Sequence, residues 1–168
     1  MQLTEKMAAE FNRQLTMELD ASHAYLAMAG WLEQAGFPGF ASWMRMQSEE
    51  ERLHALKIYQ FILDRDSLVA IGSLNAPKSE FSSVIDVYES ALHQEREVTA
   101  SLSRMYGLAN SESDFASLPI LQWFVNEQIE EESTMTQIID DLRLAEGNPQ
   151  AFLLLDRELG ARVAPTPV

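Results

Sequence analysis

The segment DSLVAIGSLNAPKSEFS, residues 66–82, lies between two long stretches of helical pattern and sets how they are connected. It contains Gly72 and Pro77, and its apolar residues are irregularly spaced, which predicts an extended connection rather than a helix. Extended at ~3.3 Å per residue, such a segment reaches about 50 Å. A helix of about 28 residues is ~42 Å long. The segment can therefore run the full length of its neighbouring helices, and we expect those two helices to be parallel.

On both sides of this segment, helix-forming residues with a period near 3.6 predict helices at 4–34, 38–65, 83–109 and 114–145, and a short helix at 149–162. Asn148 followed by Pro149 fits a helix N-cap with proline at the first helical position. Only a few residues separate the first helix from the second and the third from the fourth, so each pair should form an antiparallel hairpin. The chain, 1–168, is therefore predicted to be a single all-α domain, a four-helix bundle with one long crossover and a short C-terminal fifth helix.

The composition excludes several classes of protein. The chain has 168 residues, with 12 Lys and Arg against 26 Asp and Glu, so its net charge is −14. Such acidity argues against a nucleic-acid partner, because phosphate binding needs clustered basic residues. No apolar run approaches the ~18 residues of a membrane span, and the sequence has neither a signal-peptide pattern nor a cysteine. We therefore expect a cytoplasmic protein without membrane attachment, disulfides or thiolate metal sites.

Each of the four long helices has an apolar core-facing stripe with a glutamate in its middle, and these are Glu18, Glu51, Glu95 and Glu131. In an antiparallel hairpin, residues equidistant from the turn lie at the same height. The midpoint of Glu18 and His54 is residue 36, inside the first turn, and the midpoint of Glu95 and Glu131 is residue 113, inside the second. In the parallel pair, Glu51 and Glu95 lie at similar distances from the starts of their helices. We expect four carboxylates to converge on one layer of the core, beside one imidazole.

Four buried carboxylates need compensation, because each costs several kcal/mol when it is buried unpaired, and like charges raise one another's pKa. No Lys or Arg occupies the core-facing positions near this layer, which leaves protonation or bound cations. Two divalent metal ions would balance a charge of −4, with neutral His54 completing one site. Glu51, three residues before His54 on the same helical face, can bridge the two ions. Oxygen-rich ligation with one imidazole suits iron or manganese, with zinc as a competitor.

The residues around these positions match the motifs of a known family. The segments 48–55, SEEERLHA, and 122–132, QWFVNEQIEEE, resemble the second-helix and fourth-helix motifs of bacterial non-haem ferritins. The segments 17–19, MEL, and 93–95, HQE, add to a match that covers nearly the whole chain. The resemblance implies the ferritin-like fold, ferroxidase activity and iron storage. Fe(II) would be oxidised with dioxygen or hydrogen peroxide, and ferric mineral would collect inside a homo-oligomeric cage of 24 subunits.

The same resemblance implies two iron ions per subunit at a diiron site. Its ligands would be Glu18, Glu51 and His54 for the first ion and Glu51, Glu95 and Glu131 for the second. Gln128 would lie beside the place where dioxygen reacts. In diiron cofactor proteins and bacterioferritins, Glu-x-x-His replaces the Gln128-x-x-Glu131 of this chain. The second ion therefore lacks an imidazole and should bind more weakly.

Further residues match family positions outside the diiron ligands. Glu50, Glu127 and Glu130 match a third iron site near the inner surface, although three glutamates on solvated helix faces would look the same. Tyr25 matches a tyrosine that can supply an electron to the diiron site, and Trp123 matches a neighbouring tryptophan. Core packing alone would also explain both aromatic residues.

Two further departures from related proteins concern haem and the route of iron. Arg52 stands where haem-binding bacterioferritins have a methionine, so no haem is expected. The segment 118–121, LPIL, replaces the acidic residues that line threefold channels in animal ferritins, which leaves the route by which iron enters open.

Two other functions are compatible with the carboxylate pattern. A diiron peroxidase of the rubrerythrin kind would retain no mineral and would be expected to carry a symmetric pair of Glu-x-x-His motifs, which this sequence lacks. A metal-free structural bundle with a polar core layer would show no stabilisation by iron or zinc.

Overall fold

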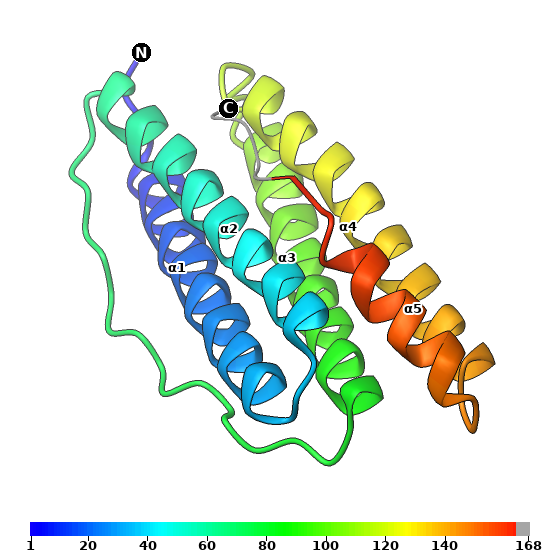
Figure 1. Ribbon diagram of the computed structural model, residues 1–168. Coiled ribbons are helices and arrows are strands. Elements are labelled where there is room, and N and C mark those ends of the chain that lie inside the picture. Colours follow the sequence, from blue (N-terminus) through cyan, green and yellow to red (C-terminus); the bar gives the residue numbers. More distant parts are fainter. Residues whose placement is uncertain (164–168) are drawn as a thin grey trace.

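The computed structural model describes residues 1–163, and these residues form five helices and no strand (Figure 1). The helices are α1 (Glu5–Gln34), α2 (Pro38–Asp64), α3 (Val84–Ser111), α4 (Leu118–Leu144) and α5 (Pro149–Leu159). The all-α four-helix bundle with a short C-terminal helix is confirmed. The end of the predicted domain, residues 164–168, lies outside the described residues.

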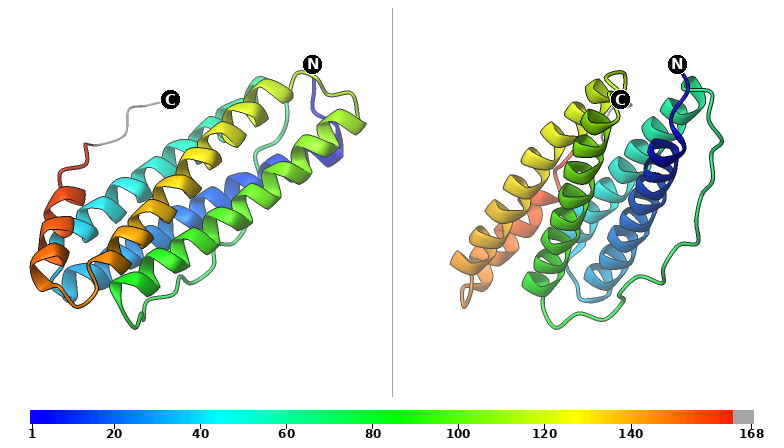
Figure 2. Two further views of the ribbon diagram at one scale, coloured as in Figure 1. Left: turned by 90° about the vertical axis from the view of Figure 1, so that its right-hand side faces the viewer. Right: turned by 180° about the vertical axis from the view of Figure 1, so that it is seen from behind.

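The segment between α2 and α3 runs along the outside of the bundle from one end to the other, so that α2 and α3 are parallel (Figures 1 and 2). Three side chains spaced four residues apart on α1 accept hydrogen bonds from the backbone of this crossover. The pairs are Ala70 N to Asn12 Oδ1 (2.6 Å), Gly72 N to Thr16 Oγ1 (3.0 Å) and Asn75 N to Asp20 Oδ1 (2.7 Å). These bonds satisfy donors that an extended segment cannot pair internally, and they hold the crossover against α1.

Side chains just before three of the helices satisfy free backbone donors of the first turn. Thr4 accepts a hydrogen bond from the backbone N–H of Met7, and Ser83 does the same for Asp86. Asn148 accepts from two backbone N–H groups at the start of α5, with Pro149 as the first helical residue. The N-cap predicted at Asn148 is confirmed.

The fourth long helix begins at Leu118, four residues after the predicted start at 114. The reason is a contact with the end of α2. Asp114 Oδ1 accepts from Arg65 Nη2 at 2.7 Å, and Ser117 Oγ accepts from Arg65 Nη1 at 3.0 Å while donating to Asp114 Oδ2 at 2.6 Å. This buried network holds the residues before Leu118 in turns, although their sequence is compatible with helix. The other helix ends lie within three residues of the predicted positions.

Two apolar clusters fill the bundle, one toward each end. One cluster includes Phe40 and Tyr88, and the other includes Phe11 and Phe124. Burial of these side chains is the main driving force that holds the four long helices together. Between the clusters, the core-facing residues of all four helices are polar, so a polar layer separates two apolar halves. Within residues 1–163, none of the helices carries an apolar stretch long enough to cross a membrane.

Candidate metal centre

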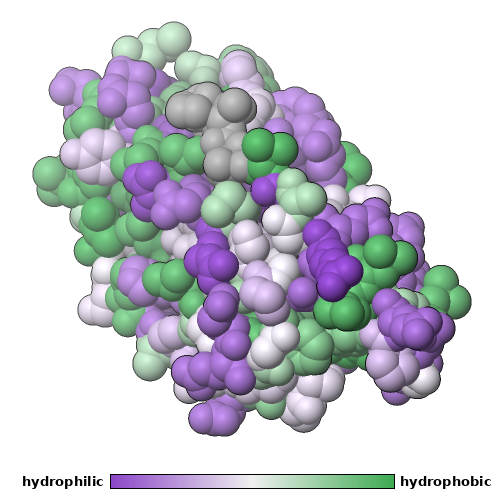
Figure 3. Space-filling model, in the orientation of Figure 1, coloured by the Kyte–Doolittle hydropathy of each residue, from purple (hydrophilic) through white to green (hydrophobic). Residues whose placement is uncertain are grey.

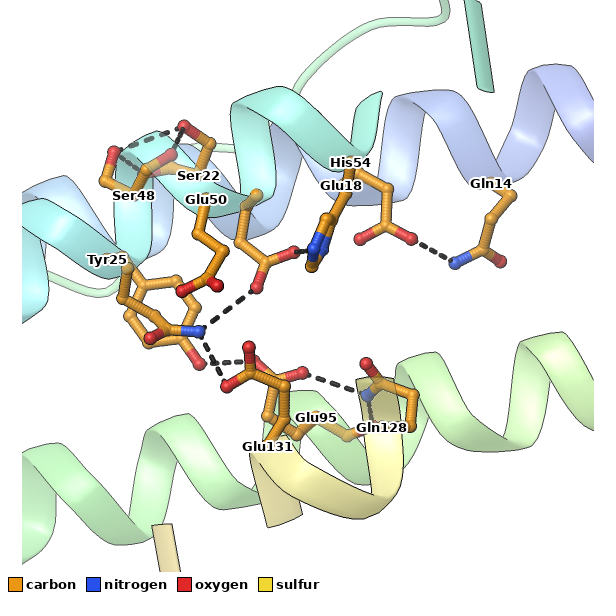
Figure 4. A network of polar contacts seen from close by, with 12 residues as sticks. Gln14, Glu18, Ser22, Tyr25, Ser48, Glu50, His54, Glu95, Gln128 and Glu131 are labelled. Carbon is orange, nitrogen blue, oxygen red and sulfur yellow. Dashed lines mark hydrogen bonds and ion pairs between the residues drawn. The ribbon is translucent and has the colours of Figure 1, made fainter. Parts of the chain in front are cut away.

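Four glutamates, one from each long helix, are buried in the polar layer. The exposed fractions of Glu18, Glu51, Glu95 and Glu131 are 1%, 2%, 1% and 7%. Figure 4 shows Glu18 and His54 projecting from α1 and α2 toward Glu95 and Glu131, which project from α3 and α4. The four carboxylates therefore converge on one layer, at the depth that the sequence spacing predicts.

Glu18, Glu51 and His54 form the tightest part of this layer. One potential ligand atom from each of the three lies within 4.8 Å of the others, and all three residues are buried. His54 Nδ1 lies 3.1 Å from Glu51 Oε2. The imidazole packs edge-on against Trp123 and Phe124, with ring centroids 5.4 and 5.7 Å apart. These contacts fix the ring, so the group can present one nitrogen and two carboxylates to a cation.

Glu95 and Glu131 lie outside that group of three and face it across the layer. Gln128 Nε2 donates to Glu95 Oε2 at 3.0 Å, which places the predicted Gln128 beside this pair. The Tyr25 hydroxyl donates a hydrogen bond to the other oxygen of Glu95. Tyr25, Glu95 and Gln128 are thus joined in one hydrogen-bonded chain across α1, α3 and α4.

Two buried amides that the sequence interpretation did not assign to the site hold the carboxylates. Gln14 Nε2 donates to Glu18 Oε1 at 2.9 Å. Gln47 Nε2 donates to Glu131 Oε2 at 2.7 Å and lies 3.4 Å from Glu51 Oε1. Each amide precedes a buried glutamate by four residues, one helical turn, on the same core-facing stripe. That repeated spacing was the signal that could have identified both residues.

One oxygen of the layer has no hydrogen-bond partner among the described residues. Glu18 Oε2 is buried and receives no donor. The orientation of Gln14 leaves this oxygen free, because Ser101 Oγ donates to Gln14 Oε1 at 2.6 Å and the amide nitrogen faces the other carboxylate oxygen. When Glu18 is ionised, this oxygen is a buried acceptor without a donor, which is costly; the protonated carboxyl can instead donate to Glu51. A cation between Glu18, Glu51 and His54 would satisfy the ionised oxygen, so the residues present fit a metal ion.

Burial is the main cause that raises the pKa of all four layer glutamates. The neighbouring charge of Glu51 adds to the rise for Glu18, and the charges of Glu95 and Glu131 add to the rise for Glu51. Burial and then the charge of Glu95 raise the pKa of Glu131 to about 8. Burial and the charge of Glu95 also raise the pKa of the Tyr25 hydroxyl. Because the pKa of Glu131 is raised to about 8, the layer holds at least one proton at neutral pH when no cation is bound.

The three further glutamates, Glu50, Glu127 and Glu130, lie beside the layer but are less enclosed. Glu50 and Glu127 are half-buried and Glu130 is exposed. Burial raises the pKa of Glu127, and the charges of Glu130 and Glu50 add to the rise, which is opposed by His54. Within residues 1–163, these three do not meet the spacing that joins Glu18, Glu51 and His54.

A cation that the four-helix pattern did not reveal lies at the edge of the layer. Arg162, three residues after the end of α5, pairs with Glu50 and donates to Gln47 Oε1 at 2.6 Å. The expectation that no Lys or Arg occupies the core-facing positions of the long helices near the layer is confirmed. Arg162 reaches the layer from outside those positions, because α5 packs against α2. Arg52 faces outward and pairs with Glu49 at 3.0 Å.

Comparison with known proteins agrees with this geometry. Residues 8–145 match the family model "Ferritin", described as a ferritin-like domain. The chain is 38% identical to a bacterial non-heme ferritin of Staphylococcus epidermidis and 36% identical to one of Staphylococcus aureus, each over 95% of this chain and 96% of the relative.

Solved structures of an archaeal protein are similar as well. An open-pore ferritin from Archaeoglobus fulgidus superposes with a TM-score of 0.94 at 37% identity, over 96% of this chain and 98% of that chain. An engineered closed form of the A. fulgidus ferritin gives a TM-score of 0.95 at 36% identity, over 97% and 99%. The chain belongs to the ferritin family.

Proposed function

We propose that this protein stores iron and oxidises it. Two Fe(II) ions would bind as substrate in the carboxylate layer. Glu18, Glu51 and His54 would hold the first ion, and Glu51, Glu95 and Glu131 would hold the second. The observation that carries the proposal is the buried, unpartnered Glu18 Oε2 within a layer of four buried carboxylates. The family and the names of the relatives support the same cargo.

Charge balance explains why oxidation would lead to mineral. Four carboxylates offset the total charge of +4 on two Fe(II) ions. Each iron gives up one electron, and dioxygen accepts the pair with two protons to become hydrogen peroxide. The metal charge then rises to +6, which the carboxylates no longer balance. Water bound to the ions loses protons to supply the missing negative charge, and the resulting oxide and hydroxide bridges are the units from which ferric mineral grows.

Three neighbouring residues would serve this oxidation. Gln128 would orient the second ion's carboxylate, Glu95, and lie beside the reacting dioxygen. Tyr25 would hold the other oxygen of Glu95 and supply an electron when one is needed. A pocket of about 310 Å³ between α3 and α4 reaches Gln128 and is lined partly by Leu102 and Val125. Its apolar walls suit dioxygen, and we propose it as the approach for the oxidant.

The further glutamates Glu50, Glu127 and Glu130 would bind a third iron ion that moves between the diiron centre and the store. Storage needs an enclosed space, and we propose a homo-oligomeric cage of 24 copies of this chain. The exposed leucines of α5 support this assembly, since Leu153 and Leu154 are 51% and 66% exposed. Apolar surface gathers over α5 in Figure 3. Size-exclusion chromatography with light scattering should give about 24 times the 19.0 kDa subunit mass.

The test of the oxidation is aerobic addition of Fe(II) to the pure protein with measurement of ferric absorbance. Glu51→Ala and His54→Ala should each abolish the fast phase, because each removes a ligand from the tightest group. Glu49→Ala is the matched control, since Glu49 is an exposed glutamate on the same helix. Fast oxidation at the unmodified rate in either ligand variant would contradict the site.

A further inference from the structure

The helix α5 is held against the start of α2 by a close backbone approach. A Cβ atom at Gly39 would lie 1.7 Å from the carbonyl oxygen of Asp156, so only glycine permits this contact. Asp156 Oδ1 also accepts from the backbone N–H of Phe40 at 2.8 Å. Because the two helices are fixed to each other here, the residues that follow α5 have a defined course over α2.

That course places Arg162 on one stripe of α2. The guanidinium carbon lies 4.6 Å from the ring centroid of Trp43, a cation–π contact. One turn further, Arg162 Nη1 donates to Gln47 Oε1 at 2.6 Å, and Nη2 pairs with Glu50. The spacing of Trp43, Gln47 and Glu50 by four and three residues is that of a single helical face. The guanidinium, which stacks on Trp43 and hydrogen-bonds both Gln47 and Glu50, is therefore held in one position.

The position of this guanidinium matters because of what its two partners do. Gln47 uses its oxygen for Arg162, and its nitrogen consequently faces Glu131 and Glu51 in the layer. Glu50 is one of the three glutamates of the proposed third iron site. The side chains of Arg162 and Glu50 are 26% and 22% exposed, so their pairing is only partly screened by water.

We propose that the Arg162 guanidinium, held in position by α5, pairs with Glu50 where the third metal ion would bind. An ion that binds to Glu50 must therefore displace Arg162. This inference rests on the proposed function, which assigns Glu50 to the third site. Displacement would also release the oxygen of Gln47 and free its amide to turn away from Glu131. Binding of a metal ion at Glu50 would thus be coupled to the geometry of the diiron centre through two hydrogen bonds, from Arg162 to Gln47 and from Gln47 to Glu131.

The test is a calorimetric titration of the assembled, full-length protein with Zn²⁺, which binds without redox chemistry. Arg162→Gln should bind the third ion about tenfold more tightly than the unmodified protein, because a partly buried charge pair no longer competes. Arg162→Lys should fall between the two, since lysine keeps the charge but cannot form the planar double contact. Arg157→Gln, at an exposed arginine of α5, is the matched control and should titrate like the unmodified protein.

A third-ion affinity in Arg162→Gln equal to that of the unmodified protein would overturn the inference. An equal gain in third-ion affinity in Arg157→Gln would also overturn it, because the gain would then arise from the change in net charge. Adding Glu50→Gln to Arg162→Gln should remove the gain, and retention of the gain would place the third ion elsewhere. Binding of the first two Zn²⁺ ions, in the carboxylate layer, tests the proposed function separately. If the unmodified protein did not bind these two ions, the result would count against the diiron site rather than against the role of Arg162.

Discussion

Gln47 on α2 donates to Glu131 on α4 at 2.7 Å, and this hydrogen bond links the α1–α2 hairpin to the α3–α4 hairpin within the carboxylate layer. The amide has no freedom to turn, because its oxygen is engaged by Arg162. The layer is thus ordered by the neutral amides Gln14, Gln47 and Gln128, whose hydrogen bonds stabilise the charged forms of Glu18, Glu131 and Glu95.

Replacement of this amide should impair oxidation. Gln47→Leu keeps most of the bulk but removes the donor to Glu131 and Glu51. We expect initial Fe(II) oxidation to slow about tenfold, since hydrogen bonds to charged groups are worth about 1.5 kcal/mol or more. Gln60→Leu, at an exposed glutamine of the same helix, should oxidise iron at the unmodified rate. Equal rates in the two variants would show that Gln47 does not orient the ligands.

Glu18→Gln should have opposite effects on stability and on metal binding. Removing one charge from the crowded layer should stabilise the metal-free protein at pH 8, because Glu18 is buried near Glu51 and its pKa is raised. The same change removes a ligand oxygen and should weaken Zn²⁺ binding at least tenfold. Thermal unfolding with a chelator and Zn²⁺ titration measure the two effects. A glutamate with a purely structural role would leave metal affinity unchanged.

The metal-free protein should lose stability as the pH rises. Folded-state pKa values of the layer glutamates lie above the unfolded value of about 4.3, with that of Glu131 at about 8. Between these values the folded state binds more protons than the unfolded state. The free energy of unfolding therefore falls with rising pH by up to ~1.4 kcal/mol per unit for each such group, and levels off above the folded pKa.

This pH dependence is measured by unfolding the chelator-treated protein between pH 5 and pH 9. Glu131→Gln should make the free energy of unfolding depend less steeply on pH, by the contribution of one titrating group. Glu49→Gln should leave this dependence unchanged. Saturating Zn²⁺ should raise stability most at high pH, because metal ions and protons compete for the same oxygens. Stability that increases steadily over this range would mean that the carboxylates are not buried together.

The turn before α4 should be important for stability and not for chemistry. Asp114→Ala leaves the buried Arg65 without its charge partner, which lies at 2.7 Å. We expect a loss of about 3 kcal/mol or more in the free energy of unfolding. The rate of iron oxidation per folded subunit should stay the same. Asp114→Asn, which keeps an acceptor for the guanidinium, should cost less.

The sequence was sufficient for much of the fold because of two regular features. Helical periodicity located the four long helices, and the length of the 66–82 crossover made α2 and α3 parallel. Equal distances from the turns set Glu18 level with His54 and Glu95 level with Glu131, and similar distances from the helix starts set Glu51 level with Glu95. These are properties of regular helices and need no knowledge of side-chain contacts.

What the sequence did not reveal depends on contacts between distant residues. The start of α4 at Leu118 follows from the pairing of Arg65 with Asp114. The approach of Arg162 to Glu50 follows from the packing of Gly39 against α5. Neither contact produces a regular spacing of residues in the sequence from which it could be predicted.

The most direct test of the central claim is anomalous diffraction from crystals soaked anaerobically in Fe(II). Two peaks are predicted in the carboxylate layer of each subunit, one within bonding distance of Glu18, Glu51 and His54 and one within bonding distance of Glu51, Glu95 and Glu131. A layer without anomalous signal, in which protonated glutamates hydrogen-bond one another or water, would contradict it.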